Sequence, residues 1–118
     1  MKEWIQTRVI IEMLGAPKEH IQETLRLYIE KIKTEEKNIV MKKVEYAEPK
    51  EVQNLFSVFA ELDLDFADVS TMVYFCFDYM PSSIEVFAPD EMVYNTTDLT
   101  DFLNDLQAIK EEVQGGYC

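Results

Sequence analysis

The sequence has few of the residues that most catalytic and metal-binding motifs require. It contains one histidine, two cysteines and three glycines among 118 residues. A single histidine excludes any metal motif that needs two, and no glycine-rich loop is present to hold a phosphate. Cys76 lies in an apolar run and Cys118 is the last residue, so we expect neither a disulfide framework nor an activated thiol. We therefore predict no catalytic residue, no metal site and no cofactor.

Apolar runs long enough to span a membrane are also missing, because charged residues or proline interrupt every candidate. Residues 1–15 mix acidic and basic side chains with apolar ones, which is not typical of a signal peptide. We therefore predict a cytoplasmic protein without a membrane partner. The length and the hydrophobic fraction of 47% suit a single domain at residues 1–113, followed by a disordered tail at 114–118.

Basic residues are nearly absent from the second half of the chain. Residues 51–118 contain Lys110 as their single basic residue against fourteen acidic ones, and the formal net charge of the whole chain is −12. Nucleic acids, anionic lipid headgroups and free phosphates need a cationic surface, so each is disfavoured as a partner. The acidity indicates either a surface that promotes solubility, which is the commoner case, or attraction to a basic protein partner.

Hydrophobic periodicity predicts an α+β domain. Alternation of apolar and polar residues predicts strands within 4–14, 38–49, 55–68 and 82–88, and helical spacing predicts helices at 17–34, 69–80 and 97–113. A change of parity at Lys42-Lys43 predicts a bulge in the second strand. Asp68 is expected to cap the second helix, with Pro81 ending it, and Thr97 to cap the third. Residues 69–80 also suit a buried strand, and their two end signals favour the helix.

The order βαββαβ followed by a helix is typical of the ferredoxin-like fold. That fold predicts an antiparallel sheet in the order 4-1-3-2, with two helices on one face and the C-terminal helix as an addition. The third strand then carries an acidic row consisting of Glu61, Asp63 and Asp65. We expect Arg8 on the first strand and Lys42 or Lys43 on the second to pair with this row. A divalent-cation site is the less favoured alternative, since strand residues two apart are too widely spaced.

The helix predicted at 69–80 is apolar almost all round, although a helix on a sheet needs only one apolar face. Its outer side therefore needs a cover, and the C-terminal helix or a second subunit are the two candidates. The interface residues that we predict are Phe75, Phe77, Met80, Phe102 and Leu106.

Asp78 is a carboxylate inside the most aromatic run of the chain. Such surroundings favour either an acid of raised pKa or a polar anchor for a ligand. The commoner alternative is that Asp78 lies on the polar side of its helix with Thr71 and Tyr74. A pocket for an apolar or cationic small molecule is predicted from Tyr74, Asp78, Tyr79, Ser82, Ser83 and Phe87. His20 lies near the start of a helix, where we expect it in solvent.

Two resemblances arise from the second half of the chain. The segment FCFDYMPSSIEVFAPDEM, residues 75–92, resembles a block found in small archaeal proteins that have no assigned activity. The segment SIEVFAPDEM with the helix after it is similar to the end of the ferredoxin-like extension of WYL-domain transcriptional regulators, although the WYL core is absent. Neither resemblance implies a functional residue in this chain.

The sequence therefore predicts a non-enzymatic, acidic regulatory or protein-interaction module that forms a homodimer. The alternative is a sensor of small molecules, similar to ACT domains, that uses the aromatic residues between 74 and 87. An enzyme that uses Asp78 and Tyr79 is the third hypothesis.

Overall fold

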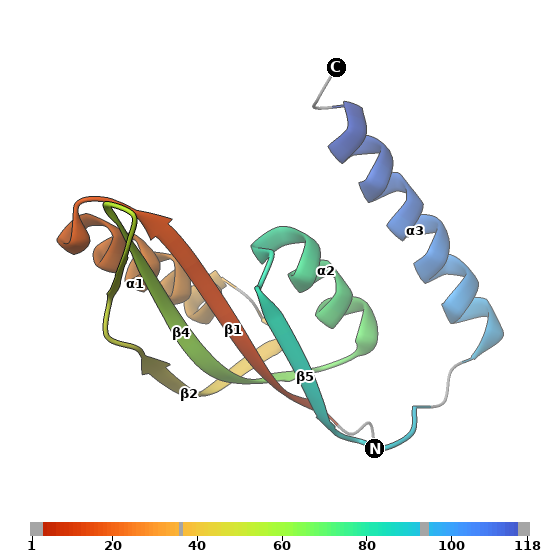
Figure 1. The fold of residues 1–118 in the computed structure, drawn as a ribbon. Helices are drawn as coiled ribbons and strands as arrows, with labels where there is room; N and C mark the ends of the chain where they lie inside the picture. The colour runs from red at the N-terminus through yellow and green to blue at the C-terminus, as the bar shows by residue number, and fades with distance from the viewer. Residues whose placement is uncertain (1–3, 36, 93–94, 116–118) are drawn as a thin grey trace.

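The protein folds as an α+β domain with one antiparallel sheet and three helices (Figure 1). A computed structural model describes residues 4–35, 37–92 and 95–115. Its elements are β1 (Ile5–Gly15), α1 (Lys18–Glu35), β2 (Ile39–Tyr46), β3 (Lys50–Val52), β4 (Leu55–Phe66), α2 (Val69–Tyr79), β5 (Ser83–Ala88) and α3 (Thr96–Gly115). The predicted α+β class and antiparallel sheet are confirmed.

The sheet has the order β2-β4-β1-β5, and the short β3 pairs with the far end of β4. In the register between β1 and β4, Val9 lies opposite Leu62, and both side chains are fully buried. Alternation therefore places the odd residues of β1 and the even residues of β4 on one face, which forms the core. The opposite face carries the charged residues of both strands and has no helix packed on it among the described elements.

Helices α1 and α2 both cover the buried face of the sheet. Four isoleucine and leucine residues of α1 recur at helical spacing and are buried against it, namely Ile21, Leu25, Ile29 and Ile32. Helix α2 contributes Phe75 and Tyr79, whose rings stack at 5.0 Å between centroids. Tyr28 joins the two helices, because its hydroxyl donates a hydrogen bond of 2.9 Å to the Tyr79 carbonyl.

Several local predictions are confirmed by the backbone. The register between β2 and β4 shifts between Met41 and Lys43, where a bulge was expected. Residues 69–79 form a helix, and the Asp68 carboxylate accepts a hydrogen bond from the Thr71 N–H as an N-cap. The helix ends at Met80, which has a left-handed conformation (φ 46°) and donates its N–H to the Cys76 carbonyl. These end signals decide between helix and buried strand for this apolar run.

One short strand was missed, and one predicted helix cap is wrong. Residues 50–52 form strand β3, joined to β4 by a hairpin turn at Gln53 and Asn54, which both have positive φ. A turn with positive φ at both central positions matches the right-handed twist of the strands. The cap of α3 is Asn95 rather than Thr97, because the Asn95 side chain accepts hydrogen bonds from the next helical N–H groups. Asparagine competes well for this position, and the helix accordingly begins at Thr96.

Helix α3 stands away from the rest of the fold (Figure 1). A ring contact between Tyr74 of α2 and Phe102 of α3, with centroids 5.8 Å apart, joins it to the body. The helix includes residues 114 and 115 of the segment predicted as a tail, whereas residues 116–118 lie outside the described residues. None of the helices in the described ranges has the length and hydropathy to cross a membrane.

Candidate functional site

The N-terminal end of α2 is fixed by one carboxylate oxygen. Asp68 Oδ1 accepts hydrogen bonds from the Thr71 N–H at 2.8 Å, the Thr71 hydroxyl at 2.7 Å and the Ser70 hydroxyl at 2.9 Å. The bond from the Thr71 N–H satisfies one of the backbone groups that helix formation leaves unpaired, and the two hydroxyls hold the carboxylate in place. The cap therefore fixes where α2 begins, and the buried Phe75 and Tyr79 determine which side of the helix faces the sheet.

A pocket of about 320 Å³ opens between α2 and the segment that leads into β2. Its lining consists of Lys37, Asn38, Ile39, Thr71, Tyr74, Phe75, Asp78 and Tyr79. The α2 residues of this set follow Thr71 at three, four, seven and eight positions, so helical periodicity brings them to one side of the helix. The volume falls within the range of sites that hold small organic molecules.

The pocket carries one carboxylate and one ammonium group. Both Asp78 and Lys37 are exposed, and within the described residues neither forms an ion pair. Partial burial and, secondarily, the Asp78 charge raise the pKa of Tyr28, because each disfavours the phenolate form. The pKa of Tyr74 is raised by partial burial and by Asp105 of α3. The two tyrosines therefore stay neutral at physiological pH. Tyr74 lines the pocket, whereas Tyr28 lies outside its lining, and the pocket combines opposite charges with aromatic rings.

The structure brings half of the predicted ligand-binding residues together. Tyr74, Asp78 and Tyr79 line the pocket, and Asp78 shares a side of α2 with Thr71 and Tyr74, as the alternative interpretation of Asp78 held. The other three predicted residues, Ser82, Ser83 and Phe87, lie elsewhere.

The contacts of these three residues are with β1 rather than with the pocket. The Ser82 hydroxyl and N–H both donate to the Ile10 carbonyl, and Ser83 pairs with Ile10 in the ladder. The Phe87 ring lies 5.2 Å from the Arg8 guanidinium. These three residues therefore do not join the pocket.

Residues 37–39 line the pocket but were missed by sequence reasoning. They lie 30 to 32 positions before the start of α2 in the chain, and the pairing of Ile39 with Phe66 brings the start of β2 next to the helix. The sequence of βαββαβ elements was the one signal that placed the second strand near the second helix.

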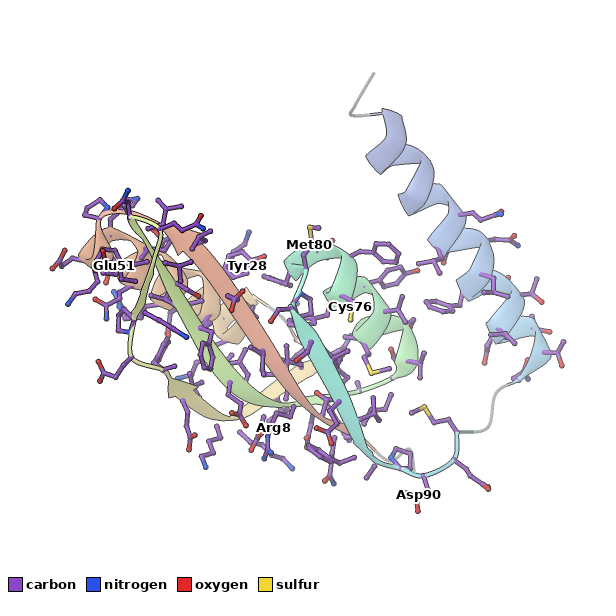
Figure 2. All side chains as sticks on the ribbon, viewed as in Figure 1. Arg8, Tyr28, Glu51, Cys76, Met80 and Asp90 are labelled. Atoms are coloured by element: carbon purple, nitrogen blue, oxygen red, sulfur yellow. The ribbon has the colours of Figure 1, made fainter. Side chains whose placement is uncertain are left out.

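A second candidate surface lies on the outer side of α2 and continues over β5 and α3. We call it the α2–β5–α3 face, and it consists of Phe77, Met80, Ile84, Val86, Leu99 and Leu103. Each of these side chains is at least 36% exposed, and Met80 reaches 80%. In Figure 2, Met80 lies at the end of α2 and points away from the sheet. Large apolar groups collected on adjacent elements are typical of an interaction site.

The register explains why β5 contributes to this face. Ile84 and Val86 lie opposite Val9 and Thr7, which places them on the same side of the sheet as the helices. Helix α2 packs on β4 there and leaves β5 at the edge largely bare. The apolar side of an edge strand is thus exposed.

One predicted interface residue belongs to the core instead. Phe75 is 2% exposed and packs edge-on against Phe66, with ring centroids 5.2 Å apart, so it is not available to a partner. Phe77, two positions further, points in nearly the opposite direction on the helix and is exposed. Phe102 and Leu106 of α3 are half-buried.

On the face of the sheet that no described helix covers, charged side chains of neighbouring strands form ion pairs. Arg8 Nε lies 2.9 Å from Glu61 and 3.1 Å from Asp63, and Lys42 lies 2.7 Å from Asp65. The hydrogen bond and charge of Asp63 raise the pKa of Arg8. The predicted pairing of the acidic row with flanking cations is confirmed, and it accounts for the row without a bound metal ion.

The remaining reactive side chains are not part of either surface. His20 is exposed on the first turn of α1, as predicted. Cys76 is half-buried, and burial raises the pKa of its thiol. No cluster of three metal-ligating side chains occurs in the part of the chain that the structure describes.

A comparison with protein-family models places the chain in a family. A family model described as the MJ0538 family matches residues 6–116, which is nearly the whole chain. This agrees with the resemblance of residues 75–92 to small archaeal proteins without an assigned activity. No curated protein and no solved structure matches the chain.

Proposed function

The chain belongs to the MJ0538 family, and we propose that it is a non-enzymatic, acidic, cytoplasmic module that pairs with a second copy of itself. The pairing surface is the α2–β5–α3 face. The observation that carries the proposal is that six large apolar side chains on three elements are left exposed.

We further assign the domain to the ferredoxin-like fold. The sheet order β2-β4-β1-β5 supports this assignment, since β3 lies outside the main path and α1 and α2 share one face. Counting the four main strands in chain order, the sheet has the order 4-1-3-2 when it is followed from β5. The fold selects no activity by itself, so the function is argued from the surface.

Helix α3 supports an interaction role because it is amphipathic but poorly covered. Leu99 and Leu103 lie on the same side as Phe102, and they are 42% and 51% exposed. Helices in water draw most of their stability from packing an apolar side rather than from propensity. A long helix with one described ring contact to its own domain therefore has apolar surface left for a partner.

The size of the face suits a weak to moderate dimer. Fully burying a large apolar side chain contributes roughly 1.5–3 kcal/mol, and these residues are already about half buried. In a symmetric dimer both copies contribute, so the gross gain is roughly 9–18 kcal/mol. Association itself costs roughly 4–15 kcal/mol, so the central values leave a net free energy of pairing of roughly 4 kcal/mol, which corresponds to a weak dimer with a dissociation constant near the millimolar range.

A second copy fits this face better than an unrelated protein. Each copy presents both halves of an interface, a projecting helix α3 and an uncovered surface on α2 and β5 (Figure 1). Two-fold symmetry lets α3 of each copy cover α2 and β5 of the other, so one surface is sufficient. The described charges of α3, Asp98, Asp101 and Asp105, lie beside its apolar stripe and stay in solvent at the rim.

Sedimentation equilibrium of three proteins tests the proposal. The wild type is compared with Leu103→Asp on α3 and with Leu27→Asp on α1, whose leucines are 51% and 54% exposed. Because the two substitutions make the same chemical change on equally exposed helical positions, they differ in surface alone. We expect Leu103→Asp to weaken dimerisation at least about tenfold, equivalent to 1.4 kcal/mol, and Leu27→Asp to leave it unchanged.

Two results would count against the proposal. A wild-type protein that stays monomeric at several hundred micromolar has no such dimer. Equal weakening by Leu103→Asp and Leu27→Asp would place the contact elsewhere. Far-ultraviolet circular dichroism of each variant checks that the fold is retained.

A further inference from the structure

We propose that the pocket beside α2 binds a small zwitterion, with Asp78 pairing with its ammonium group and Lys37 with its carboxylate. The apolar body of the ligand lies against the aromatic rings of the pocket. The inference does not rest on the proposed dimer, because neither charged residue belongs to the α2–β5–α3 face. It rests instead on which charges, rings and hydrogen-bonding groups share one pocket.

The anionic side of the pocket is Asp78. Its carboxylate is exposed, and no cation of the described residues lies within ion-pair distance of it. The carboxylates of β4 differ from Asp78 in this respect, since Glu61, Asp63 and Asp65 each form an ion pair. A carboxylate at the wall of an aromatic pocket favours an ammonium group, which gains both the charge pair and contact with the ring faces.

The cationic side of the pocket is Lys37, at the entrance to β2. Its neighbour Asn38 offers a side-chain amide, and across the pocket the Thr71 hydroxyl donates to Asp68 while keeping its own lone pairs. A carboxylate on the ligand accepts from the Lys37 ammonium and the Asn38 amide. The polar groups of the lining therefore supply both signs of charge and both kinds of hydrogen-bonding group.

The aromatic walls of the pocket are held in place before any ligand binds. Tyr74 presents a half-buried ring to the pocket, and behind it the rings of Phe75 and Tyr79, 2% and 6% exposed, stack on each other. Tyr79 is also packed edge-on against Tyr28 at 5.3 Å, and its carbonyl accepts the Tyr28 hydroxyl. Rings whose positions are fixed by their own contacts lose little freedom on binding, which favours affinity.

The charge pattern selects a zwitterion over a simple anion or cation. A simple anion is repelled by the Asp78 carboxylate in the pocket and by the net charge of −12 on the chain. A simple cation finds Asp78 but leaves Lys37 as a like charge in the same pocket. A molecule with an amino and a carboxylate group on an apolar body satisfies both residues together, and about 320 Å³ holds a molecule of that size.

Three probes that share a phenethyl skeleton and differ in the charged groups they carry test the proposal on the full chain. Phenylalanine is the zwitterion, phenethylamine lacks its carboxylate, and hydrocinnamate lacks its ammonium group. Each is titrated into isotope-labelled protein while the amide shifts of the pocket residues are followed. We expect phenylalanine to shift the resonances of the pocket and to bind at least about fivefold more tightly than either singly charged probe.

Two variants assign each charge to its partner. Asp78→Asn should weaken phenylalanine by about tenfold while leaving hydrocinnamate no weaker than before, and Lys37→Gln should weaken phenylalanine while sparing phenethylamine. Asp90→Asn, at an exposed position outside the pocket lining, is the matched control and should change nothing. Because all three sites are exposed, the variants are expected to fold.

The proposal is overturned by any of three results. The first is the absence of shifts at the pocket with all three probes up to tens of millimolar. The second is binding of phenethylamine or hydrocinnamate as tight as that of phenylalanine, which would mean that one charge is not used. The third is an unchanged affinity for phenylalanine in both Asp78→Asn and Lys37→Gln. Sedimentation of the same samples reports on the dimer separately.

Discussion

The N-cap of α2 provides a quantitative test of how the candidate sites are positioned. Asp68→Ala removes the oxygen that accepts from the Thr71 N–H, the Thr71 hydroxyl and the Ser70 hydroxyl. Loss of an N-cap costs about 0.5–2 kcal/mol. The two hydroxyls can turn toward water because the site is only partly buried, whereas the Thr71 N–H cannot. We therefore expect a loss of about 1–2 kcal/mol in the free energy of unfolding.

Urea denaturation followed by tryptophan fluorescence and circular dichroism measures this loss. Asp68→Asn keeps an accepting oxygen and should recover most of the stability. Asp90→Ala, which removes the same charge from an exposed loop position, should change the free energy of unfolding by less than about 0.5 kcal/mol. If Asp68→Ala is no less stable than Asp90→Ala, the Asp68 cap does not stabilise the start of α2, and this reasoning is refuted.

Three further predictions concern single contacts. Tyr28→Phe removes the hydrogen bond to the Tyr79 carbonyl and should cost about 0.5–1.5 kcal/mol in urea denaturation, and no loss would contradict the contact. In a Cys118→Ser background, the alkylation of Cys76 should rise at a higher pH than in the urea-unfolded chain, because burial raises the pKa of the thiol and less thiolate is present at any given pH; coincident profiles would disprove this. Gln53→Gly should stabilise the protein by about 0.5–1 kcal/mol, because φ is 49° there and glycine adopts that region without strain, whereas a destabilised variant would argue against the turn.

The sequence was sufficient to predict most of the regular elements, because periodicity and end signals report directly on local structure. The alternation of β4, the bulge beside Lys43 and the Asp68 cap all depend on residues close together in the chain. The ion pairs of Arg8 were predictable from the strand order, since Arg8 and Asp63 lie directly opposite each other in the register. Strand β3 was missed because three residues are too few to show a period.

The candidate sites were predicted only in part, because they depend on the rotation of α2 and on contacts between distant segments. A helix that is apolar all round does not reveal which side faces the sheet, so Phe75 and Phe77 were both assigned to the interface although one is in the core. Lys37 lines the pocket because β2 pairs with β4, and the residues near Lys37 in the sequence give no sign of that pairing. The side of α2 that faces the sheet and the segments that line the pocket are therefore determined by tertiary packing, which local sequence patterns do not reveal.

The central claim is that two copies meet through the α2–β5–α3 face. The most direct measurement is an isotope-filtered nuclear Overhauser spectrum of an equal mixture of labelled and unlabelled chains, which detects only contacts between copies. We predict contacts from the Met80 and Leu103 methyl groups of one copy to Phe77 or Val86 of the other, with a sedimenting species of twice the 13.8 kDa chain mass. A spectrum without contacts between copies at these groups, at a concentration where the protein is dimeric, would contradict the claim.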